Sequence, residues 1–436
     1  MLQVFYALTG LLAIFMCLFS SSFRSKLYLT DSMIAMVFGI FLKLGGVQIS
    51  LEDKTFQLEF ARICVGLQVM TTGINMPNRY VQHNWRSFMV MLLPVMLFGW
   101  LICTAIILIV PNISFLEASM IAACITPTDP VLANAITTGP FAEKYIPDDI
   151  RHLISFESGA NDGLGYPFLF LPIYLSQFPT GDAFTQWFLI TILFTVLLSI
   201  VLGAILGYIL NFVCRWTQKE SHMSLEYLEI FTVAMSITIL GLVGGLGSDD
   251  ILAVFTCGVI FNRDGFLKSE WGIDFGEGVD TLFNVVFFLY LGSILPVHEW
   301  TWQHFIVALL VIVFKRLPVL LLYKIIPDIK NFKQALFVGW FGPIGVSGLF
   351  YCLVLLENYN SVVAYPLVTL IIFCSVFVHG LSVPVIVVSD YLEKWSGIHC
   401  SLLFDPKNEI ELQNAQDYIS QKHRAHNESE RDLEQS

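Results

Sequence analysis

Charged residues are scarce in this sequence. Of its 436 residues only 13% are Asp, Glu, Lys or Arg, 56% are hydrophobic, and the mean hydropathy is +0.71. Soluble domains carry about a quarter charged residues, so this composition excludes a soluble globular protein. The short alternating segments of a transmembrane barrel are also missing. The chain instead contains repeated apolar runs of about 20 residues, the length with which a helix crosses a bilayer. We therefore expect an all-α polytopic membrane protein.

Signals for metal or disulfide chemistry are missing as well. The nine cysteines lie mostly within apolar runs and show no CxxC spacing, which is typical of small buried side chains. The net charge of -12 is uninformative about nucleic acid. Neither a nucleic-acid partner nor a cofactor is expected.

The apolar runs predict thirteen transmembrane helices within residues 1–397, followed by a polar, largely disordered cytosolic tail over 398–436. The spans run over 2–22, 27–45, 58–76, 86–110, 113–139, 150–176, 185–214, 225–246, 249–262, 277–295, 303–326, 333–356 and 361–391. Lys and Arg fall in alternate connections, and only the connection with Lys43, Lys54 and Arg62 breaks the alternation. The positive-inside rule then places the N-terminus outside and the C-terminus in the cytoplasm.

Two of these spans contain helix breakers at membrane depth. Span 113–139 holds Pro127 and Pro130 in a break near 126–130, and span 333–356 holds Gly342 and Pro343 in a break near 342–345. The two spans are seven apart, so spans 1–6 can match spans 8–13 in opposite orientation. We expect two inverted six-helix repeats with crossed broken helices, the architecture of secondary transporters.

Span 150–176 carries two acids in an otherwise apolar helix, Glu157 and Asp162. A charge at the bilayer centre costs at least ~2.5–3.5 kcal/mol, which makes intramembrane acids functional candidates. Helical spacing puts Ser158 on the face of Asp162, and Asn161 on the neighbouring face with Glu157. We expect Asp162 and Ser158 to face an ion, and Glu157 and Asn161 to face a structural partner.

Asp129, in the first break, is the predicted companion of Asp162. A hard monovalent cation such as Na⁺ prefers oxygen ligands, which Asp162, Asp129, Ser158, Thr128 and freed backbone carbonyls supply. The alternative for Asp129 is a helix cap, and both roles can hold together.

Two further features are accessory candidates, and a third, Arg316, is a structural candidate. Asp249 and Asp250 follow a glycine-rich run, where N-capping is the alternative. His379 lies inside a span, either as a proton-relay member or as a satisfied buried histidine. Arg316, next to Lys315 inside span 303–326, either pairs with Glu157 or extends to the interface.

Taken together, these motifs resemble the monovalent cation/proton antiporter superfamily, on its sodium/proton exchanger branch. The resemblance rests on Thr-Pro-Thr-Asp-Pro-Val at 126–131, Glu-Ser-x-x-Asn-Asp at 157–162, Ser-Asp-Asp at 248–250 and Phe-Gly-Pro-Ile-Gly-Val at 341–346. With Leu-Leu-Pro-Val-Met at 92–96 and Ala-Leu-Phe-Val-Gly at 335–339, the chain looks most like the fungal plasma-membrane Na⁺/H⁺ antiporters over about residues 5–395.

This resemblance implies a homodimer in the bilayer that exchanges Na⁺ or Li⁺, sometimes K⁺, for H⁺. It implies that Asp162 binds ion and proton, that Asp129, Thr128 and Ser158 complete the site, and that Glu157 is structural. Asp249 and Asp250 look like the paired acids important in the fungal members. One departure is Ile344, where many exchangers carry an arginine that pairs with the acid equivalent to Glu157. Arg316 as substitute partner is our own inference.

The expected mechanism is competition of a proton and a cation for one carboxylate, Asp162, with alternating access around it. Because position 161 is Asn rather than a second Asp, we expect one-for-one, electroneutral exchange. K⁺/H⁺ exchange is the nearest alternative. Rivals of other classes are an intramembrane aspartyl hydrolase using Asp129 with Asp162, a channel, and a structural scaffold.

Overall fold

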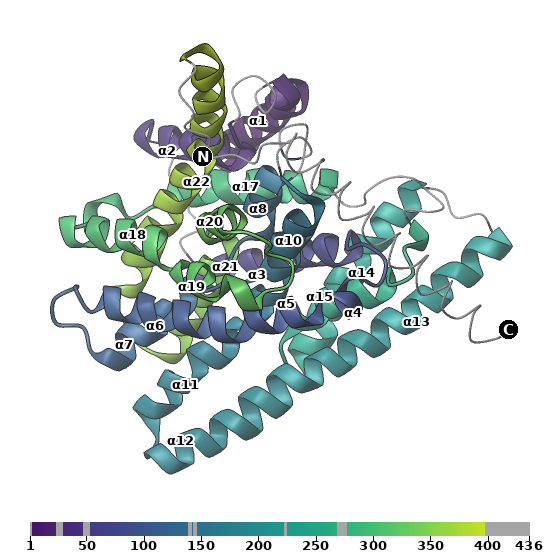
Figure 1. The fold of residues 1–436 in the computed structure, drawn as a ribbon, viewed down its shortest axis with the longest axis horizontal. Helices are drawn as coiled ribbons and strands as arrows, with labels where there is room; N and C mark the ends of the chain where they lie inside the picture. The colour runs from purple at the N-terminus through teal and green to yellow at the C-terminus, as the bar shows by residue number, and fades with distance from the viewer. Residues whose placement is uncertain are drawn as a thin grey trace, which may run out of the picture.

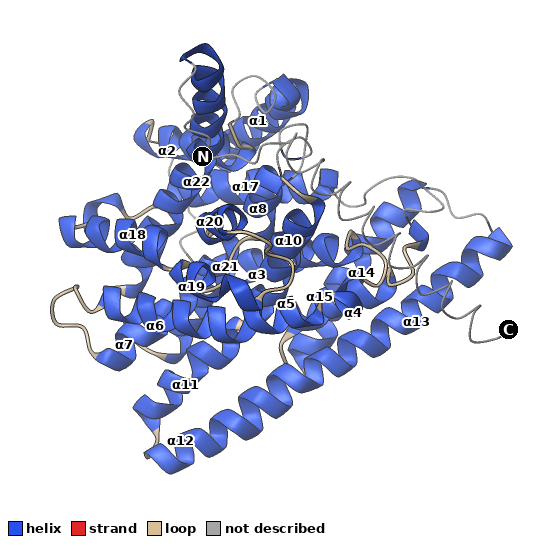
Figure 2. Ribbon diagram, in the orientation of Figure 1, coloured by secondary structure: helices blue, strands red, loops and turns tan. Residues whose placement is uncertain are grey.

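The computed structural model describes residues 2–22, 29–46, 53–137, 142, 146–221, 225–267 and 277–396. Every element in these ranges is a helix (Figures 1 and 2). The all-α prediction is therefore confirmed. The predicted tail 398–436 lies outside the described residues, and so do Arg24, Lys144 and Lys268, which are among the basic residues of the predicted cytoplasmic connections.

The helices follow the predicted apolar runs closely. The first half contains α1 (Leu2–Ser22), α2 (Asp31–Leu44), α3 (Lys54–Ile74), α4 (Tyr80–His83), α5 (Trp85–Val90), the π-helix η2 (Met91–Val95), α6 (Met96–Ile107), α7 (Phe115–Ile125), α8 (Pro130–Thr137), α10 (Asp148–Gly163) and α11 (Gly165–Gln177). The second half contains α12 (Thr180–Gln186), the π-helix η3 (Trp187–Leu197), α13 (Leu198–Ser221), α14 (Leu225–Gly245), α15 (Asp250–Phe261), α17 (Glu277–Ile294), the 3₁₀ turn η4 (Val297–Glu299), α18 (Trp302–Phe314), α19 (Leu317–Leu322), the 3₁₀ turn η5 (Tyr323–Ile325), α20 (Phe332–Trp340), α21 (Val346–Asn358) and α22 (Ala364–Ser396).

Five stretches of the described chain are long and apolar enough to cross a membrane. They are Trp85–Ile107, Thr180–Gln218, Tyr227–Gly245, Trp302–Ile325 and Ala364–Ser382. Only 22% of the most apolar window of Thr180–Gln218 is buried, so this long helix offers an apolar surface that suits lipid (Figure 1). Shorter apolar helices cover parts of five other predicted spans, within α1, α7, α15, α17 and α21. The count of thirteen transmembrane spans stays a prediction, whereas the described helices agree with a polytopic membrane protein.

The two halves of the chain pack in a matching way. Helix α2 crosses α17 and α3 crosses α15, at points where glycines meet. A Cβ on Gly39 would lie 3.0 Å from the Cα of Gly292, and a Cβ on Gly73 would lie 3.2 Å from the Cα of Gly258. Small residues let helix backbones approach this closely in membrane proteins. The sequence distance from Gly39 to Gly258 equals that from Gly73 to Gly292, which supports the expected repeat of the two halves.

Both predicted breaks are present, and they cross. The first interrupts a span between α7 and α8 at residues 126–129, and the second interrupts another between α20 and α21 at residues 341–345. The backbone N–H of Asp129 in the first break donates to the carbonyl of Pro343 in the second, at 2.8 Å. The freed backbone groups are thus satisfied by protein, as irregular chain at membrane depth requires.

Candidate functional site

Asp129 joins the two breaks. It is fully buried, and its Oδ1 accepts hydrogen bonds from the backbone N–H groups of Val131 and Leu132, both at 2.9 Å. Its Oδ2 accepts from the N–H of Val346, the first residue of α21, at 2.8 Å. One carboxylate therefore caps the N-termini of both half-helices, where its charge meets two positive helix ends. Asp129 thus acts as a helix cap, which is the alternative predicted for this residue from the sequence.

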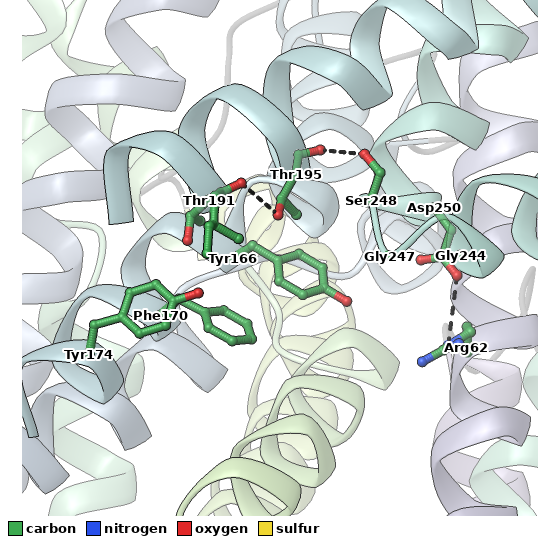
Figure 3. Close-up of a pocket in the computed structure, with 11 residues that line it drawn as sticks. Arg62, Tyr166, Phe170, Tyr174, Thr191, Thr195, Gly244, Gly247, Ser248 and Asp250 are labelled. Carbon is green, nitrogen blue, oxygen red and sulfur yellow. Dashed lines mark hydrogen bonds and ion pairs between the residues drawn. The ribbon is translucent and has the colours of Figure 1, made fainter. Parts of the chain in front are cut away.

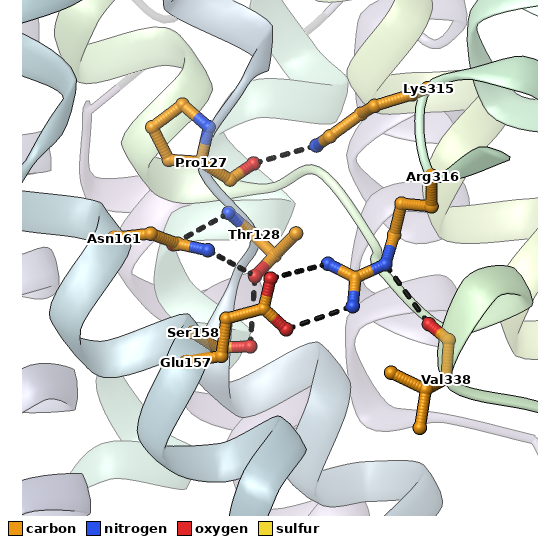
Figure 4. Close-up of polar contacts among 8 residues, drawn as sticks. All are labelled: Pro127, Thr128, Glu157, Ser158, Asn161, Lys315, Arg316 and Val338. Atoms are coloured by element: carbon orange, nitrogen blue, oxygen red, sulfur yellow. Dashed lines mark hydrogen bonds and ion pairs between the residues drawn. The ribbon is translucent and has the colours of Figure 1, made fainter. Parts of the chain in front are cut away.

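Glu157 is held in a buried ion pair. Its two carboxylate oxygens accept from the Arg316 guanidinium at 2.7 and 2.8 Å, in a bidentate pair with both side chains nearly inaccessible (Figure 4). Arg316 also donates through Nε to the carbonyl of Val338, at 3.0 Å. A Cβ on Gly342 would lie 2.0 Å from the Arg316 Cδ, so the glycine in the second break leaves space for this arginine. Arg316 thus pairs with Glu157, as we inferred from the absence of an arginine at position 344.

Lys315 reaches the first break directly. It is buried, and its Nζ donates to the carbonyl of Pro127 at 2.9 Å (Figure 4). It does not extend to the interface, which was the alternative for this pair of cations. Its ammonium group lies at a carbonyl that the broken helix cannot satisfy internally.

Thr128 is the centre of a small polar network. Its backbone N–H donates to Asn161 Oδ1 and its Oγ1 accepts from Asn161 Nδ2, both at 2.9 Å. The hydroxyls of Thr128 and Ser158 are also 2.9 Å apart (Figure 4). Ser158 and Asn161 are three residues apart on α10 and lie side by side, so the two predicted faces meet at Thr128. Thr128 lies on irregular chain between the two faces and reaches both.

Asp162 differs from every acid around it. Both of its carboxylate oxygens are fully buried and have no hydrogen-bond partner among the described residues. The Ser347 hydroxyl lies close enough to interact with this carboxylate, although it does not meet the geometry of a hydrogen bond to either oxygen. The Asp162 backbone is fixed, because the Tyr351 hydroxyl lies 2.6 Å from its carbonyl oxygen and 3.0 Å from that of Gly163. The result is a rigidly placed carboxylate with free oxygens.

His379 ties α22 to the end of α20. Its Nε2 lies 3.0 Å from the carbonyl of Trp340, and its Nδ1 lies 2.9 Å from the carbonyl and 3.1 Å from the hydroxyl of Ser375. Ser375 in turn accepts from the N–H of Ile344 in the second break, at 2.8 Å. Both ring nitrogens thus have partners that serve the helix ends, as expected for a satisfied buried histidine.

Asp249 and Asp250 lie at the start of α15, apart from the crossing. Asp249 caps the helix by accepting from Leu252 N–H at 2.9 Å, while its Oδ2 is buried without a hydrogen-bond partner among the described residues. Asp250 accepts from Ile251 N–H at 3.0 Å and lies 3.7 Å from Arg62. Capping, the alternative for this pair, is present for Asp249.

The charges of the crossing do not balance. Asp129, Glu157 and Asp162 contribute three carboxylates, and Lys315 and Arg316 contribute two cations. If all five are ionised, the crossing carries one excess negative charge, which is costly away from water. One proton or one monovalent cation at Asp162 restores neutrality. The arrangement can therefore hold either of two interchangeable charges at one carboxylate.

Sequence reasoning missed several contacts. Nothing in the sequence marks Tyr351 or Ser375 as partners of the site, since both are ordinary residues of apolar helices. Lys315 was noticed, but its contact with Pro127 depends on tertiary structure. The signal that could have found Ser347 is its position two residues after the glycine that ends the second break.

Comparison with known proteins agrees with this geometry. Residues 11–389 match the sodium/hydrogen exchanger, transmembrane family. A probable Na⁺/H⁺ antiporter of Schizosaccharomyces pombe is 34% identical over 418 residues, which cover 87% of this chain and 55% of that protein. Na⁺/H⁺ antiporter 2 of Zygosaccharomyces rouxii is 33% identical over 437 residues, covering 89% and 53%. The chain spans about half the length of these two curated relatives.

The fold also matches a solved structure. The sodium proton antiporter of Methanocaldococcus jannaschii superposes with a TM-score of 0.62 over 87% of this chain and 96% of that one, at 16% identity. The named relatives are transporters and not enzymes. On the family match over most of its length, the chain belongs to the sodium/hydrogen exchanger family.

Proposed function

We propose that the protein is a secondary active transporter that exchanges Na⁺, or Li⁺, for H⁺ across the membrane. Asp162 binds the cation or the proton but not both, and Thr128, Ser158 and Asp129 shape the site around it. The observation that carries this proposal is the fully buried Asp162 carboxylate, whose oxygens have no hydrogen-bond partner among the described residues. The two relatives are named Na⁺/H⁺ antiporters, which supports Na⁺ and H⁺ as the exchanged ions.

The charge balance also supports one-for-one exchange. A crossing with one excess negative charge is neutral with one proton and equally neutral with one Na⁺. Only a neutral site moves cheaply past the hydrocarbon, so alternating access carries each ion singly. Electroneutral exchange follows, and a steady current through reconstituted protein, driven by a Na⁺ gradient at zero membrane potential, would contradict it.

The substitution Asp162→Asn tests the carboxylate. In everted vesicles we expect Na⁺-dependent dissipation of a proton gradient to fall at least about 100-fold, because the variant has no charge for which proton and cation compete. Asp182→Asn, which removes an exposed acid in α12, is the matched control and should transport normally. Near-normal exchange by Asp162→Asn would refute the assignment.

K⁺/H⁺ exchange by the same carboxylate is the second candidate. The ligand oxygens at the crossing, from carboxylates, hydroxyls and freed carbonyls, suit any alkali cation. Vesicle assays with Na⁺, Li⁺ and K⁺ at several pH values separate the two. We further propose that the protein is a homodimer in the plasma membrane. We place its N-terminus outside and its C-terminus in the cytoplasm, an orientation that accessibility labelling at the two membrane faces would test.

A further inference from the structure

A polar cavity lies at the start of α15, away from the crossing. It has a volume of about 240 Å³ and is lined by Arg62 and Asp250 together with hydroxyl-bearing side chains of α11, η3 and the 246–249 turn (Figure 3). At about 30 Å³ per water molecule it has room for several waters. We call it the Asp250 cavity.

The acid in this cavity is buried but loosely held. Asp250 is 2% exposed, and its Oδ2 has no hydrogen-bond partner among the described residues. The Arg62 Nε lies 3.7 Å from that oxygen, beyond hydrogen-bonding distance, and the Nε itself is also without a hydrogen bond there. Arg62 has other contacts available, with Glu59 at 3.5 Å and with the Phe350 ring at 5.9 Å. A cation that enters the cavity can therefore take over Asp250 without leaving Arg62 unsupported.

Neutral oxygens line the cavity beside this carboxylate. Ser248 donates to the carbonyls of Phe194 and Thr195, both at 2.9 Å, which fixes its hydroxyl at the cavity wall (Figure 3). Thr191 and Tyr166 add two further hydroxyls to the lining. Carboxylate and hydroxyl oxygens, with water filling the remaining positions, suit a partly hydrated alkali cation.

Two aromatic rings separate the cavity from Asp162. The Tyr166 ring lines the cavity and contacts the Tyr351 ring edge-on, with 5.4 Å between centroids. The Tyr351 hydroxyl lies 2.6 Å from the Asp162 carbonyl oxygen. The cavity is thus one tyrosine pair away from the central carboxylate, at the membrane face where α14 ends and α15 begins.

We propose that the Asp250 cavity binds a hydrated monovalent cation at the Asp250 carboxylate and supplies it to Asp162 from that one membrane face. Arg62 is the resident counter-ion that the arriving cation displaces, and Tyr166 with Tyr351 closes the cavity toward the central site. This proposal rests on the exchange function proposed above. It assigns Asp250 to binding at one face only, whereas Asp162 serves both faces.

Side-specific kinetics test the proposal. The full chain is assayed in right-side-out and everted vesicles, so that added Na⁺ meets opposite faces. We expect Asp250→Asn to raise the KM for Na⁺ roughly fivefold to tenfold at one face, with a change of less than about twofold at the other. Asp250→Glu should return the KM toward the wild-type value. The exposed Asp182→Asn in α12 controls for a general loss of surface charge and should change neither KM.

Equal shifts at both faces, or no shift at either, would overturn the proposal. If Asp250→Asn fails to fold, Arg62→Gln decides. Removing the resident cation should lower the KM for Na⁺ at the same face, and an unchanged KM would overturn the proposal. Wild-type vesicles that show no Na⁺-driven proton flux would refute the exchange function itself, whereas normal wild-type flux with an unaffected Asp250→Asn variant would refute only this site.

Discussion

Asp129 and Asp162 are both fully buried acids beside the helix breaks, yet their surroundings are opposite. Asp129 accepts three backbone hydrogen bonds and closes two helix ends, whereas the oxygens of Asp162 have no such partner among the described residues. The first acid is fixed by the chain that folds around it, and the second is left for something the chain does not supply. In this crossing the fully hydrogen-bonded carboxylate holds the broken helices together, and the carboxylate without such bonds is the one that we propose as the ion ligand.

The largest effect on stability should come from Glu157→Gln. Like Asp129, Glu157 is a buried acid whose carboxylate is fully paired within the protein. The substitution leaves the Arg316 guanidinium buried without its carboxylate, which costs about 3–5 kcal/mol. Thermal unfolding in detergent should show this loss. The double variant Glu157→Gln/Arg316→Gln should be more stable than either single variant, because neither charge is then left alone. A double variant as unstable as the sum of the singles would contradict the pairing.

A smaller loss is expected from Asp129→Ala. The variant removes the acceptor for two half-helices, at about 1 kcal/mol for each cap, so unfolding should become easier by roughly 2–3 kcal/mol. Asp129→Asn keeps one acceptor oxygen and should lose about half as much. An Asp129→Ala variant as stable as the wild type would break the comparison, because Asp129 would then not build the crossing.

His379→Gln should change stability by only about 1 kcal/mol, through its hydrogen bonds to α20 and α22. Its partners are backbone carbonyls and Ser375, so the pH dependence of exchange should be the same as in the wild type. Measuring exchange rates from acid to alkaline pH checks this. A displaced pH profile would instead make His379 part of the proton path.

The smallest effect concerns Asp328, in the turn between η5 and α20. Burial raises the pKa of this carboxyl, and the negative charge of Asp149 raises it further. A raised pKa in the folded state means that ionised Asp328 costs stability as the pH rises through that value. Asp328→Asn should therefore stabilise the protein slightly at neutral pH, with no difference in acid, where Asp328 is protonated in both states. Thermal unfolding across pH measures it, and a difference that persists in acid would contradict this cause.

Much of the architecture could be predicted because a membrane helix is recognised from its own stretch of apolar sequence. The apolar runs gave the helices, Pro127 and Gly342 marked the two breaks, and the matched spacing of the breaks indicated their crossing. The acids were found because charge is rare at membrane depth. The ion pair of Glu157 with Arg316 could be inferred because a buried cation needs a counter-charge and few were available.

Partner choice within the site was harder to predict. The predicted roles of Ser158 and Asn161 differ, yet both contact Thr128, because residues three apart on α10 lie side by side and the irregular chain of the break passes both. The contact of Tyr351 with the backbone of Asp162 depends on how α21 packs against α10 and α11, which no local pattern encodes. The number of spans stays a prediction for a related reason, since breaks divide spans into helices shorter than a full crossing.

The central claim is that a proton and a cation exclude one another at Asp162. Proton release by purified protein on Na⁺ addition, followed in weakly buffered detergent solution, tests this most directly. We predict about one proton released for each Na⁺ bound by the wild type, and none by Asp162→Asn. Na⁺ binding without proton release, or release that persists in Asp162→Asn, would contradict it.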